Sequence, residues 1–320
     1  MVSKGQVLAG AAAIIAIAAA ASVGGAGFVA GVVVWLAVNA LIAASFRFVQ
    51  LIGELNFAIA GFVGVGAYGA GVATAIFQLP FMVALGIGAV LAVLVSVVFG
   101  FVTLRAKGPY FMLISFAFTE VLRMIYTQVD AIGGNSGLIG IVAPNIVQSY
   151  YAAFAVFVVV VLLFGLYAIE KSDFGKILVA IRNNDAIVEA SGINVLNTKV
   201  VCLAISAVAA GIAGALLAYS NTVISPNDFS FFLAVYALAY VKVGGEGSLL
   251  GAIVGAIVLT VLAQFALSLG HFEHIFYGAA IVLSVLLLPK GLVSLPEALG
   301  FGGDRGASGR PAQARMRGAE

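Results

Sequence analysis

Apolar runs long enough to cross a lipid bilayer follow one another along most of this chain. A spanning helix needs about 20 apolar residues, and 63% of the 320 residues are hydrophobic, against about 45–50% in soluble domains. We therefore expect an all-α fold, a polytopic transmembrane bundle of about ten helices and no fewer than eight. The ten predicted spans are residues 6–22, 28–46, 54–77, 81–104, 109–127, 151–169, 199–220, 229–243, 247–269 and 274–289.

Every second predicted connection contains basic residues, and this alternation sets the expected orientation in the membrane. Short loops rich in Lys and Arg remain in the cytoplasm, and ten spans place every basic connection on that side and both termini with them. The residues concerned are Lys4, Arg47, Arg105, Lys107, the segment 170–199, Lys242 and Lys290. The first run also resembles a cleavable signal peptide, but the even span count favours a retained first span.

The chain divides into a transmembrane domain, residues 1–300, and a tail, residues 301–320. The tail is rich in Gly, Ala and Arg without apolar periodicity, so we expect it to be disordered in the cytoplasm. Its arginines either contact anionic lipid or serve only as a topological anchor. The formal net charge of only +2 gives no reason to expect nucleic acid as a partner.

A charged insert, residues 170–199, interrupts the apolar pattern. It holds eight charged residues in a chain that is 9% charged, and its pattern predicts two short helices. Ser172 or Asp173 can cap the first, and the second is expected to start at Asn184 or Asp185 and to end at Gly192 in a left-handed conformation. The expected apolar stripe of the first helix is Phe174, Ile177, Leu178 and Ile181, with Lys176 and Arg182 facing elsewhere. The alternative, an element lying on lipid headgroups, is disfavoured because four acidic residues balance four basic ones.

Glycine concentrations and a few charges within the spans are the remaining clues. Glycines gather at residues 61–71 and 244–255, which predicts either tight helix crossing or the interrupted segments of a transport pathway. Glu120 can pair with Arg123 three residues later. Glu54 and Glu120 lie deep enough to be candidates for the pathway or for pairing, since charges inside a membrane are costly.

Motifs for chemistry within the chain are not found. Residues 165–172 come nearest to a phosphate-binding loop but put Glu170 where the second glycine is needed. His271, Glu273 and His274 lack the spacing of a zinc helix, and the single cysteine, Cys202, lies in an apolar run. We therefore expect neither an enzyme nor a metal site, and no cofactor in this chain.

Several motifs in chain order resemble the branched-chain amino acid permeases of ABC importers, of the LivM type. Residues 180–194 are similar to the cytoplasmic loop of ABC importer permeases, in which a Glu-Ala-Ala triplet precedes a glycine; here Ser191 replaces the second alanine. Further similar segments are Gly53 to Phe57 with Gly64 to Tyr68, Lys107 to Phe111 with Ala117 to Glu120, Gly133 to Leu138, Gly244 to Ser248, and Pro289 to Leu292.

The resemblance implies one membrane subunit of an ATP-driven importer in the bacterial inner membrane. Its implied partners are a LivH-like second permease, two subunits that bind ATP and magnesium, a periplasmic substrate-binding protein and the lipid bilayer. The implied ATPase-coupling residues are Arg182, Asp185, Glu189, Ala190, Ser191 and Gly192. Candidate pathway residues are Glu54, Asn56, Gly64, Gly66, Tyr68 and Glu120, where Glu54 and Asn56 depart from the Gln and Ser that the family usually has.

Three other functions remain open from the sequence. Related permeases of the same fold import urea or short amides, and a small apolar route suits either kind of solute. A secondary transporter that works alone would also use paired glycine segments and Glu120, but it would need no charged insert. A channel or a purely structural membrane subunit would leave the insert without a role in transport.

Overall fold

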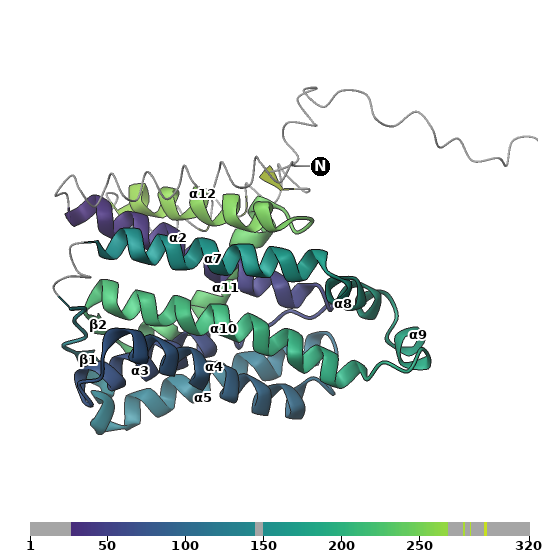
Figure 1. The fold of residues 1–320 in the computed structure, drawn as a ribbon, viewed down its shortest axis with the longest axis horizontal. Helices are drawn as coiled ribbons and strands as arrows, with labels where there is room; N and C mark the ends of the chain where they lie inside the picture. The colour runs from purple at the N-terminus through teal and green to yellow at the C-terminus, as the bar shows by residue number, and fades with distance from the viewer. Residues whose placement is uncertain (1–26, 145–149, 268–277, 279–281, 283–290, 293–320) are drawn as a thin grey trace, which may run out of the picture.

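The helices lie roughly side by side in one bundle whose two ends are built differently (Figure 1). The computed structural model describes residues 27–144 and 150–267, together with positions 278, 282, 291 and 292. The long helices are α2 (Gly27–Gln50), α3 (Ile59–Ala75), α4 (Phe81–Thr103), α5 (Pro109–Gln128), α7 (Tyr151–Lys171), α10 (Val195–Asn221), α11 (Phe231–Gly244) and α12 (Leu249–Leu267). Two shorter helices, α8 (Asp173–Asn183) and α9 (Asp185–Ala190), project from one end, which we call the charged end.

Within the described residues, five helices are long and apolar enough to cross a membrane, and a sixth span results if one bent pair counts as one. The five are Val29–Gln50, Phe81–Thr103, Pro109–Gln128, Tyr151–Lys171 and Val195–Asn221. The bent pair, Phe231–Gly244 with Leu249–Gln264, turns by 113° at the break, and Ile59–Ala75 is a shorter apolar helix. The predicted membrane bundle is confirmed at this coarser level. The predicted span 6–22 and the tail lie outside the described residues, and so does the span 274–289 apart from positions 278 and 282. The count of ten therefore stays a prediction.

Both glycine concentrations form close helix contacts. A Cβ atom on Gly66 of α3 would overlap the carbonyl oxygen of Gly211 on α10, and one on Gly88 of α4 would meet the carbonyl of Gly66. The second concentration closes the α11–α12 hairpin, where a Cβ on Gly244 would overlap the carbonyl of Gly251. Backbones approach this closely only where side chains are absent, which is how membrane helices gain packing without a hydrophobic drive to associate.

Two connections between helices bring buried residues into the bundle. The segment before α3 includes Asn56, which is 0% exposed, and Phe57, whose ring lies 5.7 Å from that of Phe231 at the start of α11. The segment before α11 includes the one-turn helix η3 (Pro226–Phe229), and Phe229 is 1% exposed. Non-helical backbone at membrane depth is tolerated where protein covers it.

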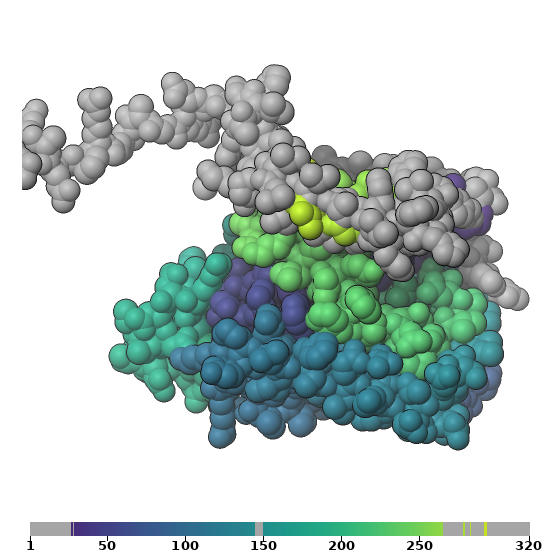
Figure 2. All heavy atoms as spheres, turned by 180° about the vertical axis from the view of Figure 1, so that it is seen from behind, coloured from purple at the N-terminus to yellow at the C-terminus, as the bar shows by residue number. Residues whose placement is uncertain are grey.

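Side chains of α5 satisfy the backbone at both interruptions. The hydroxyl of Ser115 accepts a hydrogen bond from Phe57 N at 3.0 Å, and the hydroxyl of Thr119 donates one to Phe57 O at 2.9 Å. The Glu120 carboxylate accepts from Phe231 N at 3.2 Å. This role explains the polar residues on an otherwise apolar helix. In the view from behind, the blue residues of α5 lie beside the green ones of α11 (Figure 2).

The opposite end is closed by turns and one small strand pair. β1 (Leu138–Ile139) and β2 (Val223–Ile224) pair antiparallel, with Leu138 opposite Ile224. The one-turn helices η1 (Asp130–Ile132) and η2 (Gly134–Ser136) precede β1. Gly133 has a φ of +99° and its Cβ would overlap the backbone of Gly137, which explains the glycine-rich loop there. This pairing was not predicted by an all-α fold.

Candidate functional site

The insert folds as the two helices that its pattern predicts. In α8, Leu178 and Ile181 are buried, at 0% and 1% exposed, and Phe174 and Ile177 are partly buried, whereas Lys176 and Arg182 are exposed. Ser172 occupies the N-cap position but makes no capping hydrogen bond, because its hydroxyl donates to the carbonyl of Ile169. The amphipathic stripe therefore seats α8 on the bundle.

The short helix α9 is closed at both ends by the predicted residues. The Asn184 side-chain oxygen accepts hydrogen bonds from Ala186 N at 3.0 Å and Ile187 N at 3.3 Å. At its other end Gly192 has a φ of +87°, a conformation that glycine adopts at little cost. The capping hydrogen bonds fix a six-residue helix that could not persist in isolation.

The outer face of α9 is open. The family resemblance assigns six residues to coupling, and five of them are exposed. Four lie on or directly after α9: Glu189, Ala190, Ser191 and Gly192. The fifth, Arg182, lies at the end of α8. Ile187 is 68% exposed at the same place, and the sequence-based interpretation overlooked it. A large apolar side chain standing free beside charged neighbours is typical of a contact surface.

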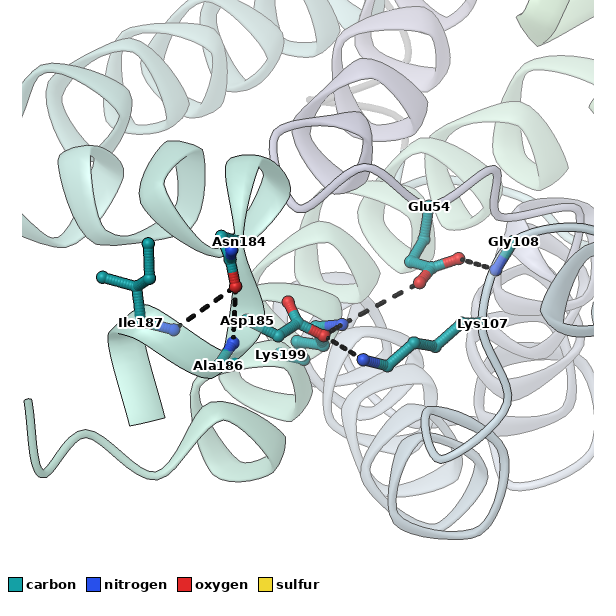
Figure 3. A network of polar contacts seen from close by, with 8 residues as sticks. All are labelled: Glu54, Lys107, Gly108, Asn184, Asp185, Ala186, Ile187 and Lys199. Carbon is teal, nitrogen blue, oxygen red and sulfur yellow. Dashed lines mark hydrogen bonds and ion pairs between the residues drawn. The ribbon is translucent and has the colours of Figure 1, made fainter. Parts of the chain in front are cut away.

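Asp185, like the buried Val188, lies on the inner side of α9, and it connects three elements (Figure 3). Its Oδ2 lies 2.7 Å from Lys107 Nζ, before α5, and 3.2 Å from Lys199 Nζ on α10. Lys199 also lies 3.9 Å from Glu54 Oε1, and Glu54 Oε2 accepts a hydrogen bond from Gly108 N at 2.9 Å. We call these residues the Asp185 network. It joins α9 to the start of α5 and to the segment before α3.

Burial decides the electrostatics of the Asp185 network. Only 4% of the Lys199 side chain and 6% of the Glu54 side chain are exposed, against 21% for Asp185. Burial raises the pKa of Glu54 above its ordinary value, although Gly108 N–H and the Lys199 ammonium act in the opposite direction. Partial burial also acts to raise the pKa of Asp185, but its bonds to Lys107 and Lys199 outweigh this and hold that pKa below its ordinary value. Asp185 is therefore the stable anion of the network.

A second ion pair ties three other elements together at the charged end. Arg47 of α2 makes two hydrogen bonds to the Glu170 carboxylate of α7, at 2.8 and 3.0 Å. Its Nε donates to the carbonyl of Glu246, between α11 and α12, at 3.0 Å, and Glu246 pairs with Lys242. The Arg47 side chain is only 4% exposed. These hydrogen bonds therefore compensate a charge that water does not reach.

A cavity of about 110 Å³ touches residues of both ion-pair groups. It is lined by Arg47, Gln50, Leu51, Gly53, Glu54, Leu55, Arg182 and Glu246. The ion pairs and the Arg47–Glu246 hydrogen bond place the basic residues Arg47, Lys107, Lys199 and Lys242 at the charged end. The prediction that these connections share one side agrees with this arrangement. Among the described residues no group of three or more His, Cys, Asp or Glu side chains is placed to hold a metal ion, and His271 to His274 lie outside them.

The six candidate pathway residues do not gather in one place. Glu54 belongs to the Asp185 network, and the backbone of Gly66 packs against Gly211. Asn56 is fully buried: its Oδ1 accepts from Ala58 N, and its Nδ2 has no hydrogen-bond partner in the described part of the chain. Glu120 pairs with Arg123 at 2.7 Å, as predicted.

Gly64 and Tyr68 do come together. Both lie against Phe229, and the Tyr68 ring stacks on that of Tyr126 with centroids 4.2 Å apart. Tyr126 and Phe229 were not predicted, since neither residue type nor spacing sets them apart from ordinary apolar packing.

A protein-family model described as "Branched-chain amino acid transport system / permease component" matches residues 28–285. The chain belongs to this family. The matched region contains the whole charged end as described, including the Asp185 network and the Arg47 ion pair. Family membership thus agrees with the resemblance that the motifs predicted.

Individual permease proteins are similar to the chain at low identity. The high-affinity branched-chain amino acid transport system permease protein LivM of Escherichia coli is 25% identical over 277 residues, which cover 77% of this chain and 65% of that protein. The ribose import permease protein RbsC of Haemophilus influenzae is 23% identical, over 78% of this chain and 81% of that protein. A probable branched-chain permease LivH of Methanocaldococcus jannaschii is 27% identical over 43% of this chain and 47% of its own length.

The chain thus spans about two thirds of the length of the curated LivM proteins it matches, 65% in the Escherichia coli case. No solved structure matches the chain.

Proposed function

We propose that this chain is a membrane-spanning permease subunit of an ATP-driven importer, and that α9 is the element through which separate ATPase subunits act on it. The observation that carries the proposal is the construction of α9. Its outer face is open, while Asp185 on its inner face is joined to α10 and to the start of α5. Such an element can receive a partner and pass a displacement on to spanning helices.

The mechanism follows from these contacts. When the ATPase subunits close, they push on α9, and its capped, short helix moves as a unit. Asp185 carries the movement to Lys199 on α10 and Lys107 before α5, a rigid-body route to alternating access. The exposed Glu189 and Arg182 then give the docking its specificity and salt dependence.

The orientation and the partners are part of the same proposal. The charged end faces the cytoplasm of a bacterial inner membrane, about ten spans cross it, and both termini are cytoplasmic, because basic connections stay on that side. A LivH-like permease completes the pore, a periplasmic binding protein delivers the solute, and the ATPase subunits hold ATP and magnesium.

Branched-chain amino acids are the proposed solutes, as in the names of the family and of the LivM relatives. The test is uptake by proteoliposomes that contain this chain with its partner subunits, using leucine, isoleucine, valine, urea and ribose. ATP-dependent uptake of the three amino acids is expected. Uptake by this chain alone, driven by an ion gradient, would contradict the importer and favour a secondary transporter.

Two substitutions test the coupling role of α9. Gly192→Pro forbids the φ of +87° at the end of α9, and Glu189→Lys reverses a charge on its open face. Both are expected to abolish uptake while the permease still inserts and assembles. Asp173→Lys makes the same charge change on α8, where the side chain is 92% exposed, and should retain uptake. Normal uptake by both α9 variants would refute the assignment.

A further inference from the structure

Two tyrosine hydroxyls are buried in this bundle without any hydrogen-bond partner in the described residues. They belong to Tyr68 on α3, which is 4% exposed, and to Tyr126 on α5, which is 6% exposed. Other tyrosines of the bundle differ: the Tyr151 hydroxyl donates to the carbonyl of Leu216, and that of Tyr219 pairs with Thr74. A buried polar group without a partner is costly and requires an explanation.

The two rings and Phe229 form one aromatic group. Tyr68 and Tyr126 are stacked, with ring centroids 4.2 Å apart and an angle of 18° between their planes. The rings of Phe229 and Tyr68 meet edge to face, with centroids 5.9 Å apart. Gly64 forms the remaining wall, since a Cβ there would lie 3.1 Å from both Phe229 and Tyr126. We call these four residues the aromatic site. As described, the rings fill it and close it to solvent.

The aromatic site lies beside the non-helical segment that precedes α11. Phe229 is the last residue of η3. Two residues later, Phe231 N donates a hydrogen bond to the Glu120 carboxylate. Discontinuous helices are where transporters commonly build solute sites. A displacement of the η3 segment would move Phe229 away from Gly64 and from the Tyr68 ring.

The charges around the aromatic site favour a cation. Glu120 and Arg123 compensate one another at 2.7 Å. Asp228, the residue before Phe229, makes no described salt bridge and is partnered by Ser225 N. The surroundings therefore carry a net negative charge. Aromatic faces attract ammonium groups, and phenol oxygens accept hydrogen bonds from them, whereas a carboxylate would find no free basic side chain among these residues.

We propose that Tyr68, Tyr126 and Phe229 form an occluded binding site for the ammonium group of the transported amino acid. The proposal rests on the importer function proposed above and adds to it the group of the solute that is recognised inside the membrane. The two hydroxyls are unpartnered in the closed site because their partner is the solute itself.

Hydroxyl removal separates this role from a structural one. Tyr68→Phe, Tyr126→Phe and the double variant are compared with wild type in the complete importer. Because the hydroxyls have no protein partner, the midpoint of thermal unfolding should stay unchanged or rise. Uptake should fall about tenfold or more in the double variant, as expected for lost hydrogen bonds to a charged group. Tyr151→Phe removes a partnered hydroxyl and should do the reverse, lowering stability without lowering uptake.

The chemical class is tested with two fragments of leucine. 3-Methylbutylamine keeps the ammonium group and lacks the carboxylate, whereas 4-methylpentanoate keeps only the carboxylate. The amine should inhibit uptake by wild type and lose about tenfold in potency in the double variant, and the acid should do neither. Inhibition by the acid alone, or equal inhibition of wild type and double variant by the amine, would overturn the ammonium assignment.

Each outcome points to one of the two proposals. Wild-type uptake without inhibitor reports the importer function, and its absence with every amino acid would refute that function. Wild-type uptake together with undiminished uptake by the Tyr68→Phe/Tyr126→Phe variant would refute the aromatic site alone. Lower stability with normal uptake in that variant would show that the hydroxyls hold a structural water molecule instead.

Discussion

Lys199 on α10 and Asp185 on α9 form an ion pair at 3.2 Å in which only 4% of the lysine side chain is exposed. A lysine near a helix end normally extends its ammonium into water. The Lys199 ammonium is instead buried in the bundle, because Asp185 and Glu54 each provide a carboxylate near it. Together with the ion pair from Asp185 to Lys107, this pair joins the exposed helix α9 to the helices of the bundle.

Removal of the lysine charge should destabilise the protein strongly. Lys199→Met leaves two carboxylates facing each other without their shared cation, and breaking a buried pair from one side costs about 3–5 kcal/mol. The free energy of unfolding in detergent should fall accordingly. The double variant Lys199→Met/Glu54→Gln should recover part of that loss, and an equal loss in both would show that Glu54 is not coupled to Lys199.

The two carboxylates of the Asp185 network should shape the pH dependence of stability in opposite ways. The pKa of Asp185 is below its ordinary value of 3.8, so its contribution is present above that value and is lost as the pH falls through the folded-state pKa. The pKa of Glu54 is above its ordinary value of 4.5. Its ionisation therefore costs stability as the pH rises above 4.5 and through the folded-state pKa.

Conservative amides isolate these two effects. Asp185→Asn should lower stability at pH 7 and flatten the acid limb of the curve, whereas Glu54→Gln should leave stability at pH 7 unchanged or higher and flatten the decline above pH 4.5. Thermal unfolding between pH 3 and pH 8 measures both. Identical curves for the two variants would contradict the assigned partners.

Arg47→Lys should weaken the charged end despite preserving the charge. A lysine cannot make the paired bonds to Glu170 and at the same time donate to the carbonyl of Glu246. The loss of bonds to a charged group predicts a fall of about 1.5–3 kcal/mol in the free energy of unfolding. Denaturant titration checks this, with Lys176→Arg, an exposed position on α8, as a control that should show no change.

The crossing of α3 and α10 should not tolerate one added methyl group. In Gly66→Ala the new Cβ overlaps the carbonyl of Gly211, and such overpacking costs about 1–3 kcal/mol or more. Gly86→Ala on α4 is the matched control, because nothing lies within 4 Å of its Cβ and alanine is the better helix former by about 1 kcal/mol. Opposite signs of the two changes are expected in thermal unfolding of the purified complex.

Local signals in the sequence predicted the insert well, and contacts between distant segments escaped prediction. The Asn184 cap, Gly192 and the stripe of α8 follow from rules that act within one or two turns, and so does the Glu120–Arg123 pair. Ser115 and Thr119 gain their roles only because the interruption before α3 lies beside α5. Tyr126 and Phe229 likewise meet Tyr68 only because distant segments pack together. The 113° bend between α11 and α12 depends on glycine contacts that no periodicity shows.

Site-directed cross-linking of α9 tests the coupling claim most directly. Ile187→Cys places a thiol on the open face of α9, at a position 68% exposed, and Cys202 is buried and will not compete. In the assembled importer this thiol should cross-link to an ATPase subunit, with a yield that changes when ATP is added, while Val223→Cys at the opposite end should not. Cross-linking from Val223→Cys and none from Ile187→Cys would contradict the role of α9.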